Sequence, residues 1–259
     1  MKYILFFFSM LLFISCSDNN EQSIDDNIDF PDINELSSSY ANMIALEDFV
    51  YVISERDLLT YKQSEVGLQE VDRQTLGWGL ESLHYRKGVL FIGSSTRMFI
   101  CALNEEYVPV LQSNTQYSDL DNFRPCDPVV ANDEIAVVSL SSSTQVTDDG
   151  CGLTIVNEIR FYDILDLKNP QLTNTMDMTS PKGMALDGDI LFVCEENHGL
   201  KVLNIENVRQ PEILYHFDDF NAKDIVSTGT SVIIVGKDHL YEYDYSDIQN
   251  VHLIWSVKV

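Results

Sequence analysis

The stretch Gly188-Asp189-Ile190-Leu191-Phe192-Val193-Cys194 contains the local pattern that decides the fold. Glycine and aspartate favour a turn, and the apolar run that follows has the length and composition of a buried strand. Leu200-Lys201-Val202-Leu203 follows a second glycine as another short strand. The two segments together predict a β-hairpin, and no amphipathic helix period is visible anywhere after the N-terminal region.

The same pattern of turn, apolar strand and second strand occurs five times, at intervals of 40 to 55 residues. A repeat of this length with about four short strands per unit is typical of a β-propeller, whereas a barrel or sandwich would not require one pattern to return. The sequence therefore predicts an all-β fold, a propeller of five blades with four antiparallel strands each, with six blades as the alternative. The propeller covers 41–259, with predicted blades at about 41–76, 77–117, 121–178, 179–220 and 221–259.

The links after some second strands support a family resemblance. Phe161-Tyr162-Asp163-Ile164-Leu165-Asp166-Leu167-Lys168-Asn169-Pro170 resembles the LVIVD repeat, in which a strand precedes Asp, a short loop and Asn-Pro, and 202–211 resembles it more weakly. Gly77-Trp78-Gly79-Leu80-Glu81 and other segments up to about residue 250 extend the resemblance to LVIVD-repeat lipoproteins of Bacteroidota. Blades 1 and 2 depart from the pattern, with Gln63-Ser64-Glu65 and Asn104-Glu105-Glu106 at the turn. The resemblance implies a propeller and no particular activity.

The N-terminus has the layout of an export signal. One lysine precedes an apolar run of 13 residues from Tyr3 to Ser15, which is shorter than the roughly 20 residues of a membrane-spanning helix. Phe13-Ile14-Ser15-Cys16 resembles a bacterial lipobox, although Phe13 replaces the usual leucine. We expect residues 1–15 to be a lipoprotein signal peptide and Cys16 to carry the lipid that attaches the protein to a membrane.

An acidic segment follows the expected lipid. Residues 16–40 contain acids and no Lys or Arg, which predicts a solvated tether. An acidic stretch in this position resembles the surface-export signal of Bacteroidota lipoproteins, and a plain spacer is the alternative. The predicted location is the cell envelope, as a surface-exposed outer-membrane lipoprotein, with the periplasmic face as the alternative.

Composition limits the partners. The formal net charge is −25, which disfavours nucleic acid and anionic membrane surfaces as ligands. Protein and neutral glycan partners at one rim of the propeller remain open.

An insertion in the third repeat, from Ser139 to Asn157, is where a binding loop is expected. A disulfide between Cys126 and Cys151 would hold this insertion, with two free thiols as the alternative. Cys101 and Cys194 lie in strands and are expected to be buried fillers. Trp78 is a candidate ligand contact, and it also fits an interface between blades. Tyr107, Tyr117 and Phe123 are weaker candidates of the same kind.

Motifs for catalysis are missing. The histidines lack metal-site spacing, no nucleophile or phosphate-loop motif is present, and the paired aspartates fit turns better than a calcium loop. We therefore predict no catalytic residue, no metal and no cofactor. The predicted function is a non-enzymatic binding or scaffold module for protein or glycan partners. The alternative is a glycan hydrolase or lyase, which would need carboxylates gathered at one mouth of the central channel.

Overall fold

The structure is a computed structural model that describes residues 41–118, 128–141 and 156–259. Its strands form five four-stranded sheets, and strands that follow one another in a sheet pair antiparallel. Each sheet falls within one of the predicted repeats. The predicted all-β propeller with five blades is confirmed, and the described residues contain no sixth sheet.

Each blade consists of four strands that are consecutive in the chain. Blade 1 contains β1 (Met43–Leu46), β2 (Phe49–Ser54), β3 (Asp57–Ser64) and β4 (Gly67–Thr75). Blade 2 contains β5 (Leu80–Arg86), β6 (Val89–Ser94), β7 (Arg97–Leu103) and β8 (Pro109–Gln116). Blade 3 contains β9 (Val129–Ala131), β10 (Ile135–Leu140), β11 (Glu158–Asp163) and β12 (Gln171–Asp177). Blade 4 contains β13 (Met184–Asp187), β14 (Ile190–Cys194), β15 (Leu200–Asn204) and β16 (Glu212–Phe217). Blade 5 contains β17 (Asp224–Ser227), β18 (Ser231–Val235), β19 (His239–Asp244), the short 3-10 helix η1 (Ile248–Asn250) and β20 (His252–Lys258).

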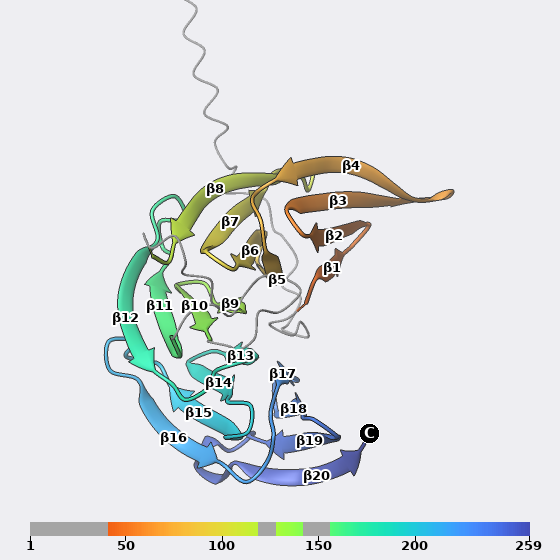
Figure 1. The fold of residues 1–259 in the computed structure, drawn as a ribbon. Coiled ribbons are helices and arrows are strands. Elements are labelled where there is room, and N and C mark those ends of the chain that lie inside the picture. The colour runs from red at the N-terminus through yellow and green to blue at the C-terminus, as the bar shows by residue number, and fades with distance from the viewer. Residues whose placement is uncertain (1–40, 119–127, 142–155) are drawn as a thin grey trace, which may run out of the picture.

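The five blades lie around a common centre (Figure 1). The first strand of each blade is innermost and the fourth is outermost. The second strands of blades 2, 3 and 4 are buried on both faces by the neighbouring blades, whereas those of blades 1 and 5 are buried mainly on one face. Outer strands such as β12 expose much of their surface, and their sequences are correspondingly polar.

Two local features repeat from blade to blade. The register between the third and fourth strands shifts once in every blade, for example between Val202 and Leu203. Such irregularities increase strand twist, as the curved outer strand of a blade requires. In blades 2 to 5 a side-chain oxygen after the third strand accepts a hydrogen bond from the backbone N–H two residues on, and it belongs to Asn104, Asp163, Asn204 and Asp244. Asn104 therefore performs the turn role that the sequence pattern assigned to aspartate.

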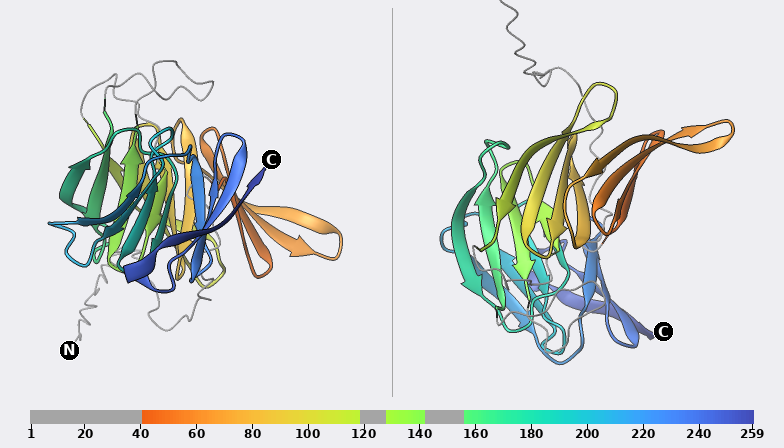
Figure 2. Two further views of the ribbon diagram at one scale, coloured as in Figure 1. Left: turned by 90° about the horizontal axis from the view of Figure 1, so that it is seen from below. Right: turned by 45° about the horizontal axis from the view of Figure 1, so that its top comes forward.

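Four hydrophobic clusters hold the blades together. Each joins two consecutive blades: 1 to 2, 2 to 3, 3 to 4, and 4 to 5. Among the described residues, no cluster joins blade 1 to blade 5, and Figure 1 shows the two blades apart at the right of the ring. The propeller is therefore an open arc. The third and fourth strands of blade 1 also project outward as a long hairpin, with Val66 at its exposed tip (Figure 2).

No helix in 41–118, 128–141 or 156–259 has the length and apolar character needed to cross a membrane.

Candidate functional site

The propeller has two faces that differ in what they carry. Because antiparallel strands reverse at every turn, the turns between second and third strands share one face with the connections between blades. We call this the loop face, and the opposite one the turn face. Figure 2 shows the strands running between the two. The described segments of the loop face are 55–56, 76–79, 95–96, 117–118, 128, 141, 156–157, 178–183, 195–199, 218–223 and 236–238.

Both features that the sequence singled out belong to the loop face. Trp78 lies in the connection from β4 to β5. The predicted insertion from Ser139 to Asn157 starts two residues too early, because Ser139 and Leu140 belong to β10, and 141–157 join β10 to β11. Of this insertion, residues 142–155 lie outside the described residues. The topology therefore places on one face two candidates that are about 60 residues apart in the sequence.

Trp78 lies on a connection that backbone hydrogen bonds fix, with its side chain outward. The backbone N–H groups of Leu76 and Gly77 donate to the carbonyl of Arg56, and Ser95 N–H donates to the carbonyl of Gly79. Gly79 has a φ of 68°, and a Cβ there would lie 2.5 Å from Ser95 Oγ, so another residue would strain this turn. The connection leads from the outermost strand of blade 1 to the innermost strand of blade 2 and leaves the indole above the face.

The indole itself is 68% exposed, and the Arg56 guanidinium lies 4.8 Å from its ring centroid. The interpretation of Trp78 as an interface plug is therefore wrong, because most of the side chain meets solvent. An exposed indole stacked on one side by a cation can accept a sugar ring or an apolar side chain on the other.

A buried ion pair supports the loop face between blades 3 and 4. Glu195 follows β14 and has no exposed surface, and its Oε2 lies 2.7 Å from Nζ of Lys201, whose side chain is 12% exposed. The contact is an ion pair without hydrogen-bond geometry. Glu195 Oε1 accepts a hydrogen bond of 2.6 Å from Thr179 N–H. The carboxylate thus fixes the connection 178–183 against the turn 195–199.

Polar side chains continue from this pair to the base of the insertion. Ser180 Oγ donates to Glu196 Oε2 at 3.0 Å, and Lys182 Nζ lies 3.9 Å from the same oxygen. Lys182 Nζ also donates to Ser141 Oγ at 3.5 Å, and Ser141 is the last described residue before the insertion continues. This row of two hydroxyls, a cation and a carboxylate can hydrogen-bond a polar ligand. It is a feature that the sequence did not suggest, because its members come from three separate connections.

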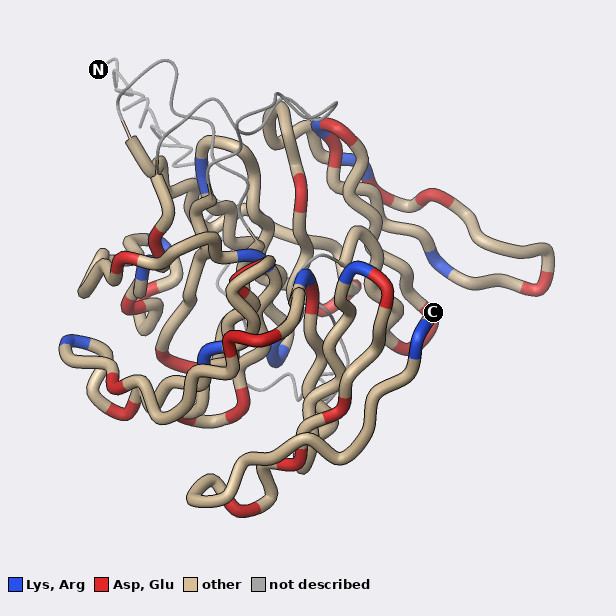
Figure 3. Tube along the Cα trace, turned by 60° about the horizontal axis from the view of Figure 1, so that its bottom comes forward, with Lys and Arg blue, Asp and Glu red and all other residues tan. Residues whose placement is uncertain are grey.

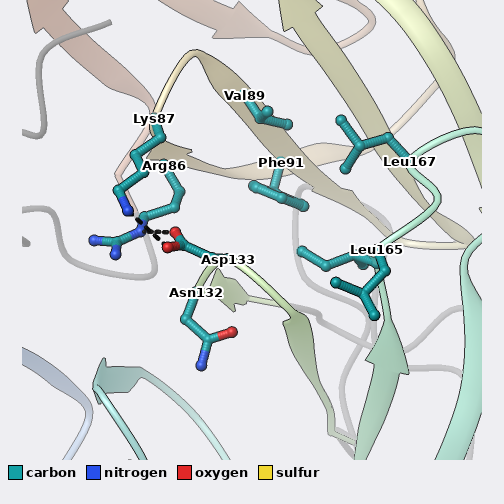
Figure 4. A pocket seen from close by; sticks show the side chains of 9 residues that line it. Arg86, Lys87, Val89, Phe91, Asn132, Asp133, Leu165 and Leu167 are labelled. Carbon is teal, nitrogen blue, oxygen red and sulfur yellow. Dashed lines mark hydrogen bonds and ion pairs between the residues drawn. The ribbon is translucent and has the colours of Figure 1, made fainter. Parts of the chain in front are cut away.

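The turn face carries a groove between blades 2 and 3 (Figure 4). Its volume is about 290 Å³, and Arg86 and Lys87 lie on one side with Asp133 between them at 2.7 and 2.6 Å. The Arg86 guanidinium and then the Lys87 ammonium hold the pKa of Asp133 below its ordinary value. Phe91 and Leu165 lie on the apolar side, and Leu165 is 73% exposed. The groove is at the small end of ligand sites, and its charged groups already bind one another.

Several other predicted residues are not available as ligand contacts. Tyr117 is buried, and Tyr107 stacks on Phe49 with ring centroids 5.0 Å apart, so both fill joints of the fold. The interpretation of Tyr117 as a partner contact is therefore wrong, whereas Tyr107 is only partly buried and stays a candidate. Cys101 and Cys194 are buried free thiols, as predicted, and burial raises the pKa of Cys101 to about 12. The remaining candidates, Cys16, Cys126, Cys151 and Phe123, lie outside the described residues.

A metal centre or an acid–base pair would need several ionisable side chains that converge on one point. The described chain has no group of three or more His, Cys, Asp or Glu side chains placed to hold a metal ion. The two carboxylates found on the loop face beside the polar row, Glu195 and Glu196, are engaged by Thr179 and Lys201 and by Ser180 respectively. Acidic and basic segments are both spread over the chain, and the acidic ones are more numerous (Figure 3).

Comparison with known proteins supports the fold alone. No protein-family model and no curated protein matches the sequence. A functionally unknown protein from Desulfotomaculum acetoxidans is similar in structure with 13% identity and a TM-score of 0.61, over 84% of this chain and 69% of that one. A hypothetical selenium-binding protein from Sulfolobus tokodaii gives 13% and 0.58, over 82% and 59%. Apo AztD from Citrobacter koseri gives 13% and 0.58, over 82% and 60%.

The chain thus spans about three fifths of the length of two of these proteins and somewhat more of the third. Structural similarity at such low sequence identity shows a shared fold and does not show a shared function. The LVIVD resemblance stays a prediction.

Proposed function

We propose that this protein is a non-enzymatic binding module whose loop face engages a protein or glycan partner. The observation that carries the proposal is Trp78, a large aromatic side chain 68% exposed on a connection fixed by backbone hydrogen bonds. Binding sites concentrate where variable loops stand on a rigid scaffold. The long insertion between β10 and β11 starts on the same face, beside the hydroxyls of Ser141 and Ser180.

The charge of the chain narrows the partner. A formal net charge of −25 repels polyanions at a distance. Neutral sugars and basic or neutral protein surfaces fit an acidic protein on which an exposed indole supplies apolar contact area. A glycan hydrolase or lyase would need two carboxylates free to act on one substrate, and the contacts of Glu195 and Glu196 do not favour that alternative.

The location is part of the proposal. Lipid on Cys16, with residues 17–40 as spacer, would hold the propeller at the outer membrane, facing the outside. Growth of the native host with a labelled fatty acid should label the wild-type chain, and Cys16→Ser should abolish the label. Protease treatment of intact cells should then remove the propeller if it is surface-exposed, whereas protection would place it in the periplasm.

The module is distinguished from the enzyme by turnover. The chain from Ser17 onward retains every described strand, and it can be screened on a glycan array with and without Ca²⁺. Each glycan that binds is then incubated with the protein and analysed for cleavage products by mass spectrometry. We expect binding without products. Accumulation of products that requires the folded chain would contradict the module and support the enzyme.

A further inference from the structure

Every blade has two sheet faces, a leading face toward the preceding blade and a trailing face toward the next one. In the four junctions within the chain, the trailing face of one blade packs on the leading face of its successor, and each junction is filled by one hydrophobic cluster. An open arc leaves two faces without a neighbour in the described residues. These are the leading face of blade 1 and the trailing face of blade 5.

The trailing face of blade 5 retains much of the apolar composition of a junction, with Glu242 at the position of the buried Val202 of blade 4. Strand register aligns Ile233, Val235 and Leu240 of blade 5 with Phe192, Cys194 and Leu200 of blade 4. The three blade 4 side chains are completely buried against blade 5, whereas Val235 is 43% exposed. Trp255 and Val257 of β20 extend the same face opposite Glu242 and Leu240, and they are 40% and 45% exposed.

The inner part of the leading face of blade 1 is apolar in the same way, whereas its outer part carries the ion pairs of Arg73 with Asp57 and Glu70. Val50 and Val52 of β2 align with Leu90 and Ile92 of blade 2, which are completely buried in the first junction. Val50 and Val52 are both partly exposed. Met43, which pairs with Val52, is 62% exposed, although it occupies the position of the fully buried Met184 of blade 4.

We propose that the trailing face of blade 5 packs on the leading face of blade 1 of a second copy of this chain. The reason is continuity, since each molecule carries both halves of a junction that it builds four times internally. The contact is heterologous, so copies join head to tail. Two chains of charge −25 repel each other, and apolar burial drives the contact, so salt strengthens the association by screening.

The test uses two variants that each block one face at exposed positions. Met43→Glu with Ala45→Glu places charge on the leading face, and Trp255→Glu with Val257→Glu places it on the trailing face. Val66→Glu, at a hairpin tip that is 84% exposed and on neither face, is the matched control. Circular dichroism and thermal unfolding check that every variant is folded, and sedimentation velocity of the chain from Ser17 onward measures the mass.

We expect wild type and Val66→Glu to associate in a concentration-dependent way, more strongly at high than at low salt. Each face variant alone should be monomeric, with at least a roughly tenfold weaker association. An equimolar mixture of the two face variants should form a dimer and nothing larger, because it has one intact junction. A wild-type chain that stays monomeric at the highest soluble concentration, or a mixture that stays monomeric, would overturn the proposal. The leading face of blade 1 and the trailing face of blade 5 would then be surfaces for a different protein.

Discussion

Glu195 is the residue whose burial most needs a partner. A carboxylate removed from water without compensation costs several kcal/mol, and here Lys201 and Thr179 N–H supply the compensation. The sequence did not reveal this pair. Glu195 reads as one polar residue of the turn Glu195-Glu196-Asn197-His198-Gly199, and Lys201 reads as a solvent-facing position of an alternating strand. The contact arises because the fold lays the connection 178–183 over both.

The Lys201→Met variant should lose about 3–5 kcal/mol of the free energy of unfolding, because it leaves the Glu195 charge buried and unpaired. Urea denaturation followed by tryptophan fluorescence measures the change. Adding Glu195→Gln to this variant should recover part of the loss, since the amide oxygen can still accept from Thr179 N–H.

Lys87→Met supplies the control, because the Lys87 side chain is 48% exposed and its ion pair with Asp133 contributes less than about 1 kcal/mol. Equal losses in Lys87→Met and Lys201→Met would show that burial does not distinguish the two pairs.

At the scale of strands and blades, the sequence was informative because the second strands of blades 2, 3 and 4 are buried on both faces, and those of blades 1 and 5 on one face. Burial on both faces produces the continuous apolar runs from which the repeat and its blade boundaries follow. The polar contacts that tie one blade to the next were not predictable, since they join residues that lie in different repeats. Two examples are the hydrogen bonds from His84 Nε2 to the carbonyl of Ala131 and from the Tyr245 hydroxyl to Asp187.

His84 predicts a pH dependence of stability. The side chain is buried between blades 2 and 3, and burial lowers its pKa from 6.5 to about 4. The unfolded state therefore binds a proton below pH 6.5 that the folded state refuses until about pH 4. Above about pH 6.5, His84 does not change the free energy of unfolding with pH. As the pH falls from about 6.5 to about 4, His84 lowers the free energy of unfolding by up to about 3 kcal/mol.

Chemical denaturation of His84→Gln across this range should show a shallower loss than wild type. The exposed His252 is the matched site, and His252→Gln should keep the wild-type slope. An unchanged slope in His84→Gln would show that His84 is protonated in the folded protein.

Tyr245 tests the joint between blades 4 and 5. Its hydroxyl donates to Asp187 Oδ2 at 2.6 Å and lies 2.5 Å from Ser227 Oγ, while its ring packs 4.8 Å from that of Phe192. Tyr245→Phe keeps the ring and removes a bond to a charged group, so it should cost roughly 1.5–3 kcal/mol in urea denaturation. Tyr61→Phe, whose exposed hydroxyl is 3.5 Å from Glu70, should change stability by only a small fraction of that. If the Tyr245→Phe and Tyr61→Phe proteins are equally stable, the hydrogen bond from Tyr245 to Asp187 does not stabilise the fold.

For the whole molecule, the repeat predicted how many blades the chain has but not that they form an open arc. Closure depends on the tilt between successive blades and on what the first and last faces meet, and neither is encoded in the spacing of strands. The composition of the candidate site also depended on topology, which the sequence does not give directly. Trp78 and the insertion from Ser139 were named from the sequence separately, and the alternation of turn direction places both on the loop face. Sequence reasoning could not choose between an exposed and a plugged Trp78, because both suit a tryptophan between two glycines.

We propose that the loop face, and not the turn face, is the binding surface. Trp78 on the loop face and Leu165 beside the turn-face groove form a matched pair, since they are 68% and 73% exposed. Substituting either by alanine should leave the fold unchanged and remove one large apolar contact from one face. The decisive measurement is the glycan array read with wild type, Trp78→Ala and Leu165→Ala, with calorimetry on the strongest hit. We expect at least roughly tenfold weaker binding in Trp78→Ala and wild-type binding in Leu165→Ala. The reverse pattern would show that the turn face, and not the loop face, binds the glycan.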